Sequence, residues 1–222
     1  FSTLLVERDA VPRFHVGESL MPETYWTLKR LGVLDQMKSS RFVRKLSVQF
    51  VGESGRESEP FYFRDHDPRE CSQTWQVERA EFDKMLFDNA AAKGADCYDR
   101  TRVMSVNFTG ERAGGVKLTT GDGKTRCVAG RVTMDATGQQ ALIANALGLR
   151  VDDPHLQNAA IWGYYRNARR DDGDNGGATI ILHTEGKQSW FWFIPLSDNI
   201  VSIGVVGSAQ YLLKGRGKPA DV

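Results

Sequence analysis

Hydrophobic and polar residues alternate in several stretches of the chain, and the densest hydrophobic stretch lies late in the sequence. Residues 190–195 hold two Trp, two Phe, an Ile and a Pro, and strand-like stretches, 178–183 and 200–206, lie on either side. Alternation puts the Trp and Ile residues on one face and the Phe and Pro residues on the other. Bulky residues on both faces need protein or ligand against each side. The stretch therefore predicts the middle of an antiparallel sheet, either as an ordinary core strand or as part of a ligand site.

Helical spacing of hydrophobic residues predicts helices over residues 23–31, 80–93 and 141–147, with Gly32 ending the first. Alternation and turn residues predict further strands at 1–7, 42–50, 60–63, 95–100, 101–108, 115–120, 126–134 and 158–169. Strands and helices are thus mixed up to residue 157, and strands with short connections follow. We predict a mixed α/β (α+β) fold with a Rossmann-like nucleotide-binding domain over 1–157 and an antiparallel-sheet substrate domain over 158–222.

The composition is that of an ordinary globular protein. The chain has 222 residues, of which 41% are hydrophobic, and its net charge is +1, so no basic surplus argues for nucleic acid. No hydrophobic run approaches the roughly 18 residues of a membrane helix, and no signal-peptide pattern is present. We expect a cytoplasmic protein without membrane contact. The cysteines, Cys71, Cys97 and Cys127, lack metal-type spacing, and we expect structural cysteines and no metal site.

The first predicted strand ends in a carboxylate, Glu7. In dinucleotide-binding folds an acidic residue about 20 residues after a glycine-rich turn binds the ribose hydroxyls. That turn would lie before Phe1, so we expect a fragment that lacks its N-terminal glycine motif and its C-terminal region. Alternatively, Glu7 is only a surface residue at the end of a strand.

A lysine lies within the otherwise hydrophobic stretch 42–50. Four hydrophobic residues of one parity are expected to face the core, namely Phe42, Leu46, Val48 and Phe50, whereas Lys45 would lie on the opposite face. Lysine at such a position is usually a solvated residue or guards a sheet edge. A functional amine is the alternative.

Six motifs in this order resemble those of the flavin-dependent halogenases, and they cover nearly the whole chain. They are Glu7, the segment Pro12–Pro22, Lys45 in its F-V-x-K context, Gln76–Arg79, Asp135–Gly138, and Trp190–Pro195 with its W-x-W-x-I-P pattern. The context of Lys45 is nearer to the phenol and pyrrole halogenases than to the tryptophan halogenases. Ser47 stands where that pattern usually has Gly.

The resemblance implies a role for each motif. Residues near FAD would be Glu7, Arg13, Gly17, Ser19, Gln76, Arg79, Val103, Asp135 and Gly138. The catalytic amine would be Lys45, and Trp190, Trp192, Ile194 and Pro195 would line a tunnel between flavin and substrate. Local alternatives remain: a capped helix start at Pro22, a surface helix start at Arg79 and an ordinary strand-to-helix turn at Asp135.

The implied reaction uses reduced FAD from a separate flavin reductase, oxygen, and chloride or bromide. Hypohalous acid would pass along the tunnel to Lys45 and halogenate a small electron-rich aromatic, free or tethered to a carrier protein. Two rival functions remain. One is an FAD-dependent monooxygenase or oxidoreductase of the same superfamily, which would not need Lys45. The other is a non-catalytic binding module or inactive remnant.

Overall fold

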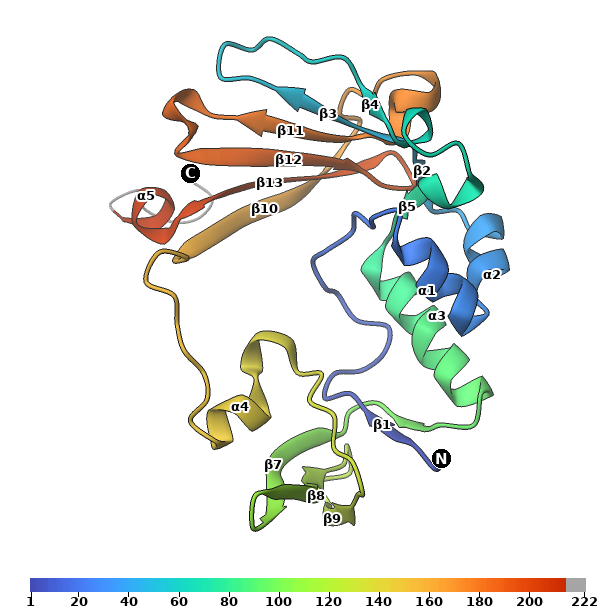
Figure 1. The fold of residues 1–222 in the computed structure, drawn as a ribbon, viewed down its shortest axis with the longest axis vertical. Coiled ribbons are helices and arrows are strands. Elements are labelled where there is room, and N and C mark those ends of the chain that lie inside the picture. Colours follow the sequence, from blue (N-terminus) through green and yellow to red (C-terminus); the bar gives the residue numbers. More distant parts are fainter. Residues whose placement is uncertain (215–222) are drawn as a thin grey trace. The chain divides into compact units, whose positions relative to one another are not determined.

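The computed structural model describes residues 1–214, and they form two compact units that interleave along the chain (Figure 1). The first unit joins Phe1–Phe14 to Asp83–Asp153, and the second joins His15–Phe82 to the chain from Pro154 onward. The predicted division into consecutive domains, 1–157 and 158–222, is a division by function and stays a prediction. The predicted mixture of helices and strands is confirmed.

The helices are α1 (Thr24–Leu31), α2 (Leu34–Ser39), α3 (Arg79–Ala92), α4 (Leu142–Ala146) and α5 (Ala209–Leu213). The early strands are β1 (Leu4–Val6), β2 (Val43–Lys45), β3 (Ser47–Val51), β4 (Phe61–Tyr62), β5 (Thr74–Gln76) and β6 (Asp96–Tyr98). The later strands are β7 (Arg102–Thr109), β8 (Arg112–Thr119), β9 (Thr125–Ala129), β10 (Asn158–Arg166), β11 (Thr179–His183), β12 (Ser189–Pro195) and β13 (Ile200–Ser208).

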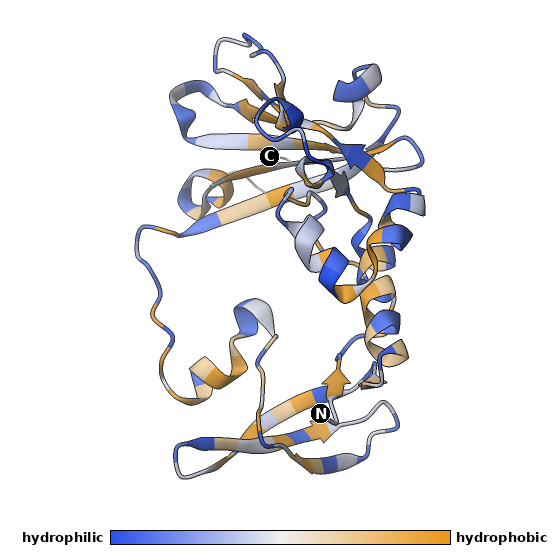
Figure 2. Cartoon of the chain, turned by 45° about the vertical axis from the view of Figure 1, so that its right-hand side comes forward, coloured by the Kyte–Doolittle hydropathy of each residue, from blue (hydrophilic) through white to orange (hydrophobic). Residues whose placement is uncertain are grey.

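The second unit is built on a six-stranded sheet in the order β10-β13-β12-β11-β3-β4. Neighbours among β10, β13, β12 and β11 are antiparallel, and short connections join β11 to β12 and β12 to β13, as the sequence predicts. The pair of β11 and β3 is parallel, and through it a strand from the first quarter of the chain joins the edge of the later strands. Hydrophobic residues follow the strands, and the loops between them are mostly hydrophilic (Figure 2).

The single strand predicted over 42–50 is two strands with different partners. β2 pairs with β5, whereas β3 pairs with β11 and β4, so the ladder is interrupted at Leu46. The predicted core face is confirmed at Phe42, which is buried, and is wrong in β3: Phe50 is 43% exposed, whereas Ser47 and Gln49 are buried. The cause is a polar partner, Asn175, which accepts from Ser47 Oγ and donates to Gln49 Oε1. A hydrogen-bonded polar face can be buried as readily as a hydrophobic one.

The first unit contains the antiparallel sheet β7-β8-β9 and the parallel pair of β1 and β6. The hairpin of β7 and β8 was predicted and is confirmed. The strand predicted over 126–134 is too long, because β9 ends at Ala129 and residues 131–134 pair with no strand among residues 1–214. Val132 and Met134 are accordingly exposed.

The first helix ends as its sequence predicts. Gly32 follows α1 with φ +76°, and its N–H donates to the carbonyl groups of Leu28 and Lys29. This left-handed conformation is one that glycine adopts at low cost, so the stop signal and the structure agree.

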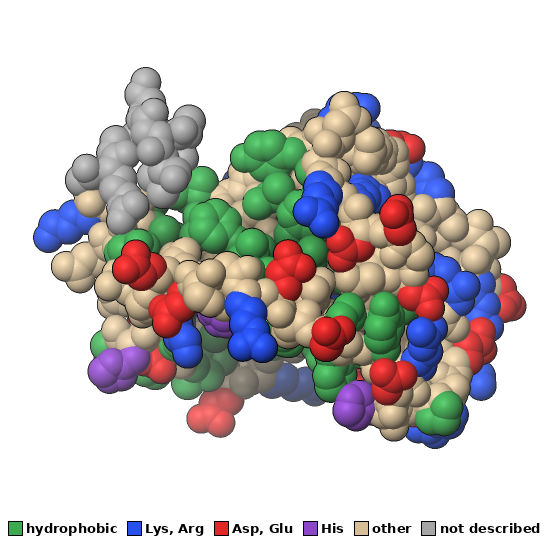
Figure 3. Space-filling view, turned by 90° about the horizontal axis from the view of Figure 1, so that it is seen from above, with side chains coloured by type: hydrophobic (Ala, Val, Ile, Leu, Met, Phe, Trp, Pro, Cys, Tyr) green, Lys and Arg blue, Asp and Glu red, His purple; other side chains and the backbone are tan. Residues whose placement is uncertain are grey.

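The structure also bears on membrane helices, metal clusters, disulfides and surface charge. Within residues 1–214 no helix is long and hydrophobic enough to cross a membrane, and no cluster of His, Cys, Asp or Glu could hold a metal ion. The cysteines form no disulfide. Acidic and basic side chains are interspersed on the face shown in Figure 3.

Candidate functional site

Lys45 lies at the end of β2 and its side chain is buried, with 5% of the residue exposed. Its Nζ is hydrogen-bonded to Ser19 Oγ at 2.8 Å and to the carbonyl oxygen of Leu20 at 3.2 Å. The ring of Phe63 lies 5.7 Å from Nζ. Burial lowers the pKa of Lys45 to about 8, because an ammonium group loses hydration in this environment.

The carboxylate next to Ser19 in the sequence is committed to another partner. Glu18 is buried, and its Oε1 accepts a hydrogen bond from the hydroxyl of Tyr164 at 2.5 Å. Burial raises the pKa of Tyr164, and the hydrogen bond to Glu18 adds to that effect. The ion pairs between residues 1–214 include none with Lys45. The amine is therefore held by neutral groups.

A chain of neutral polar groups leads away from the amine. Ser19 Oγ lies 2.8 Å from Thr179 Oγ1, at the start of β11. Gln76 Nε2 donates to Thr179 Oγ1 at 2.9 Å and to the carbonyl oxygen of Gly177 at 3.0 Å. Gln76 is fully buried, and its Oε1 has no hydrogen-bond partner among the described residues.

The amine approaches the six-stranded sheet from the face that carries the two tryptophans. Trp192 lies opposite Ile181 in the pairing of β12 with β11. Opposite residues of antiparallel strands share a face, and so do residues two apart along one strand. Thr179 therefore lies on the same face as Trp192, and Ser19 connects Thr179 to Lys45.

The two tryptophans differ in their surroundings. Trp192 is 8% exposed and Trp190 is 37% exposed, with ring centroids 6.3 Å apart. Trp192 Nε1 donates to Ser202 Oγ at 3.1 Å. Its ring covers Gly204, where an added Cβ would lie 2.3 Å from Trp192 Cζ2 and 2.6 Å from Trp162 Cβ. Trp192 is thus a core residue, whereas Trp190 is accessible.

Two of the residues predicted to line a tunnel, Ile194 and Pro195, are buried like Trp192. Ile194 forms a hydrophobic cluster with Trp192 and Leu196, and Pro195 is buried beside it. The core-strand alternative raised by the sequence therefore describes their packing. A place along a ligand path stays a prediction.

The residues expected near the flavin ribityl and phosphate groups lie around Gly17. Arg79, the first residue of α3, donates from Nη1 to the carbonyl oxygens of Val16 at 2.7 Å and Gly17 at 3.4 Å. Gly17 has φ +109°, and an added Cβ would lie 2.9 Å from that nitrogen. The glycine thus lets the guanidinium group pack against the backbone. Gln76 and Ser19 are engaged in the polar chain, and contact of these residues with a cofactor stays a prediction.

The residues expected near the ribose and diphosphate form an ion-paired group in the first unit. Arg13 Nε lies 3.1 Å from Glu7 Oε2, and Arg13 Nη1 lies 2.9 Å from Asp83 Oδ2. Glu7 Oε1 also accepts from the N–H of Asp9. The structure therefore brings Glu7 and Arg13 together, and their charges balance each other.

Asp135 closes the turn before α4. It accepts hydrogen bonds from the N–H and hydroxyl of Thr137, at 2.9 and 2.6 Å, and from the N–H of Ile143 at 2.8 Å. The bond from the Thr137 hydroxyl is the main cause that lowers the pKa of Asp135. Gly138 has φ +62° with no heavy atom within 4 Å of an added Cβ. Its backbone is open to close approach by a ligand.

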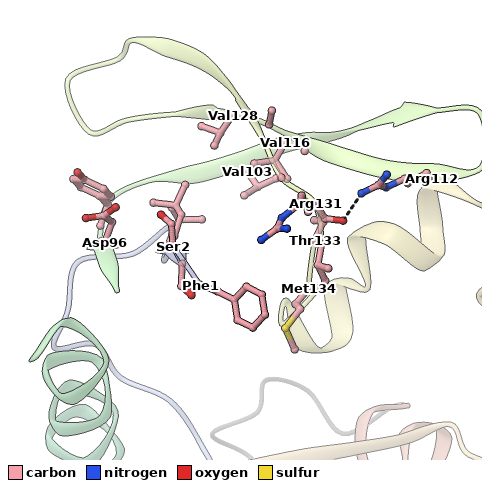
Figure 4. A pocket seen from close by; sticks show the side chains of 18 residues that line it. Phe1, Ser2, Asp96, Val103, Arg112, Val116, Val128, Arg131, Thr133 and Met134 are labelled. Atoms are coloured by element: carbon pink, nitrogen blue, oxygen red, sulfur yellow. Dashed lines mark hydrogen bonds between the residues drawn. The ribbon is translucent and has the colours of Figure 1, made fainter. Parts of the chain in front are cut away.

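Val103 lines a groove of about 990 Å³ in the first unit (Figure 4). Its hydrophobic wall includes Val116 and Val128, and Arg131 lies with its guanidinium 5.7 Å from the ring of Phe1. Arg112 donates to the carbonyl oxygen of Arg131 at 2.9 Å. The groove can hold a flat hydrophobic group beside polar atoms.

Sequence reasoning missed three members of the site. Glu18, which is buried, accepts from the hydroxyl of the 43% exposed Tyr164, and Thr179 connects Ser19 to Gln76. Glu18 lies inside a recognised motif, so its position could have suggested a role. Tyr164 and Thr179 lie in strands that carry no local signal of polar contact, because their partners lie 146 and 160 positions away, respectively.

Comparison with known proteins gives one family. The family model described as tryptophan halogenase matches residues 59–217. A flavin-dependent halogenase of Armillaria mellea, armH2, is 31% identical over 98% of this chain and 45% of its own length. A 1H-pyrrole-2-carbonyl-(peptidyl-carrier protein) chlorinase of Pseudomonas fluorescens is 28% identical over 92% of this chain and 50% of its own length. The chain thus spans about half the length of the curated relatives it matches.

A solved structure agrees with these relatives. The myxobacterial chondrochloren halogenase CndH, described as a variant of the FAD-dependent halogenases, is 37% identical with a TM-score of 0.86. The alignment covers 96% of this chain and 49% of that chain. The agreement confirms the predicted fold class.

Proposed function

The chain belongs to the tryptophan halogenase family, whose curated relatives are named flavin-dependent halogenases, and from this premise we propose that it is part of a halogenase whose catalytic amine is Lys45. The enzyme would use reduced FAD, oxygen and chloride or bromide to halogenate an electron-rich aromatic ring. One observation carries the proposal: Lys45 is buried without an ionic partner in the described residues, on the sheet face that carries Trp192.

The residues present fit FAD. The open backbone at Gly138 permits close approach of a phosphate-bearing ligand, and the groove beside Val103 suits a flat ring. Glu7 would accept from the ribose hydroxyls, and Arg79 offers a guanidinium at the start of α3. Arg13, Gly17, Ser19, Gln76 and Asp135 complete the proposed set. Bound reduced FAD would supply the reducing equivalents with which oxygen and halide give hypohalous acid.

Lys45 would transfer the halogen. A neutral amine attacks the halogen of hypohalous acid: the nitrogen–halogen bond forms as the oxygen–halogen bond breaks, and the departing hydroxide takes one amine proton and leaves as water. The resulting haloamine would pass its halogen to the aromatic ring: the carbon–halogen bond forms as the nitrogen–halogen bond breaks, and the proton that the ring loses returns to the amine. Burial favours the neutral amine that this step needs. Trp190, Trp192, Ile194 and Pro195 would form the hydrophobic wall that separates substrate from flavin.

The substrate class and partners are also proposals. The context of Lys45 supports a phenol or pyrrole, and the chlorinase relative is named for a pyrrole on a peptidyl-carrier protein. A small aromatic, free or carrier-bound, would therefore be the substrate. A separate flavin reductase in the cytoplasm would supply reduced flavin.

The experiment uses the full-length protein that contains this chain, with the substitution Lys45→Met. Halogenated product should fall at least ~100-fold, since transfer by a positioned side chain contributes about that much. Flavin absorbance and oxidation of reduced flavin by oxygen should persist. Lys84→Met, which removes an exposed lysine of α3, is the control and should keep its activity. Halogenation by Lys45→Met at the original rate would overturn the role of Lys45.

A monooxygenase of the same superfamily is the second candidate, favoured by the core packing of Trp192 and Ile194, which serves any enzyme of this fold. It would keep Glu7, Arg79 and Asp135 and add oxygen to its substrate. Product mass separates the two, because only a halogenase gives the isotope pattern of chlorine or bromine.

A further inference from the structure

In the polar chain beside Lys45, the contacts of the buried Gln76 fix which group donates and which accepts. The carbonyl oxygen of Gly177 can only accept, so the amide end of Gln76 that faces it at 3.0 Å is the NH2 group. The second hydrogen of that group then points to Thr179 Oγ1 at 2.9 Å. Gln76 therefore donates at both of its contacts.

The next proton follows from the first. Thr179 Oγ1 accepts from Gln76, and its only other side-chain partner among the described residues is Ser19 Oγ at 2.8 Å. The threonine proton finds an acceptor among the described residues only if the hydroxyl donates to Ser19 Oγ. One lone pair of Ser19 Oγ is then used, and its own proton remains to be placed.

Two arrangements are possible at Ser19. If Lys45 is an ammonium, it donates to the second lone pair of Ser19, whose proton then has no acceptor among the described residues. If Lys45 is a neutral amine, Ser19 donates to the nitrogen lone pair, and an amine N–H still donates to the carbonyl oxygen of Leu20. The second arrangement places the hydroxyl proton of Ser19 and leaves one amine N–H without an acceptor among the described residues, whereas the first leaves both the Ser19 proton and one N–H without acceptors. In the second arrangement the bonds from Gln76 to Lys45 also run the same way and strengthen one another.

We propose that Gln76, Thr179 and Ser19 are positioning residues, whose hydrogen bonds run in one direction and end on the lone pair of a neutral Lys45 amine. The importance of this chain for catalysis rests on the proposed function. The chain holds the amine neutral and fixes its orientation before substrate arrives, and the lone pair becomes free to attack a halogen once the hydrogen bond from Ser19 is broken.

Charged neighbours do not account for the neutral amine. The titratable or charged side chains on the segments around it are His15, Glu18, Arg44, Tyr62, Arg64, Asp65, Tyr164, Asp171 and Asp174. None forms an ion pair with Lys45, and burial is the only cause that lowers its pKa. Glu18 is bonded to Tyr164, and Asp174 is paired with Arg64. The neutral groups of Ser19, Thr179 and Gln76 are therefore the polar contacts that decide whether Lys45 is an ammonium or a neutral amine.

The test follows the 13Cε resonance of Lys45 by NMR as pH is raised, in the full-length protein with labelled lysine. Lys45→Met assigns the resonance. Ser19→Ala removes a donor to the neutral amine, so it should raise the pKa of Lys45 by about 1, the equivalent of one hydrogen bond. Thr179→Val frees Ser19 to accept, so it should raise the pKa also. Thr179→Ser keeps the hydroxyl and should restore the original value.

The sign of the change decides the outcome. If Ser19 instead accepts from an ammonium, Ser19→Ala lowers the pKa of Lys45, and that result or no change overturns the proposal. Ser47→Ala is the matched control. It removes a buried hydroxyl two residues from Lys45 that donates to Asn175, and it should leave the pKa of Lys45 unchanged. The NMR result does not depend on turnover. If Ser19→Ala raises the pKa of Lys45 but the full-length protein has no halogenase activity, the proposed hydrogen-bonded chain is supported and the proposed function is rejected.

Discussion

The surroundings of Lys45 and those of Glu7 handle charge in opposite ways. Glu7 and Arg13 lie partly exposed in the first unit and neutralise each other, with Asp83 as a second partner. Lys45 is buried in the second unit among hydroxyl, amide and carbonyl groups, without an ion pair in the described residues. A balanced, solvated pair can be structural at little cost, whereas a buried amine without a counter-charge destabilises the fold. Such a cost is typical of a functional site.

The largest expected effect tests that cost directly. The folded protein lowers the pKa of Lys45 from 10.5 to about 8, so between these pH values the unfolded chain binds a proton that the folded chain does not. The stability contributed by this site therefore rises as pH increases from about 8 to 10.5. At pH 7 the burial of Lys45 costs up to about 3 kcal/mol. Lys45→Met should relieve that cost.

Urea unfolding at pH 7 and pH 10.5 measures the difference. Lys45→Met should be more stable than the wild type at pH 7, and most of its advantage should be gone at the higher pH. Lys84→Met, on the exposed face of α3, should change the free energy of unfolding by less than about 0.5 kcal/mol at either pH. A destabilised Lys45→Met at pH 7 would mean that packing and hydrogen bonds of the lysine outweigh its desolvation.

How well the sequence predicts a structural feature here depends on how far apart along the chain the interacting residues lie. The end of α1 at Gly32 and the hairpin of β7 and β8 are encoded by residues near each other, and both were predicted correctly. The burial of Ser47 was not, because it depends on Asn175, which lies 128 positions later. Alternation shows which residues share a face and leaves open which face is buried.

Separation along the chain also decides which parts of the site around Lys45 could be predicted. The motif around Ser19 and the position of Lys45 could be recognised in the sequence. Their hydrogen bond and the link to Thr179 could not, since β11 enters beside β3 only through a parallel pairing between distant segments. The strand predicted up to Met134 failed likewise, because a hydrophobic stretch forms a strand only where a partner strand accepts its backbone hydrogen bonds.

A second test makes the same chemical change in both units. Tyr164→Phe removes the hydroxyl that donates to buried Glu18, and should destabilise the protein by about 2 kcal/mol, because a buried carboxylate loses a donor. Thr137→Val removes the hydroxyl that donates to exposed Asp135, and should cost about 0.5 kcal/mol, since water replaces it. Urea unfolding of both variants gives the comparison, and equal losses would show that burial does not separate the two sites.

The smallest expected effect concerns the pair of Arg13 and Glu7. A double-mutant cycle with Arg13→Met and Glu7→Gln should give a coupling energy of about 0.5–1 kcal/mol, as is usual for partly exposed ion pairs. The coupling should shrink in 1 M salt, where screening extends over only about 3 Å. The cost of burying Lys45 involves no paired charge and should hardly change in the same salt. If the coupling instead exceeded about 3 kcal/mol and resisted salt, Arg13 and Glu7 would behave as a buried pair, and the contrast between the two units would rest on Lys45 alone.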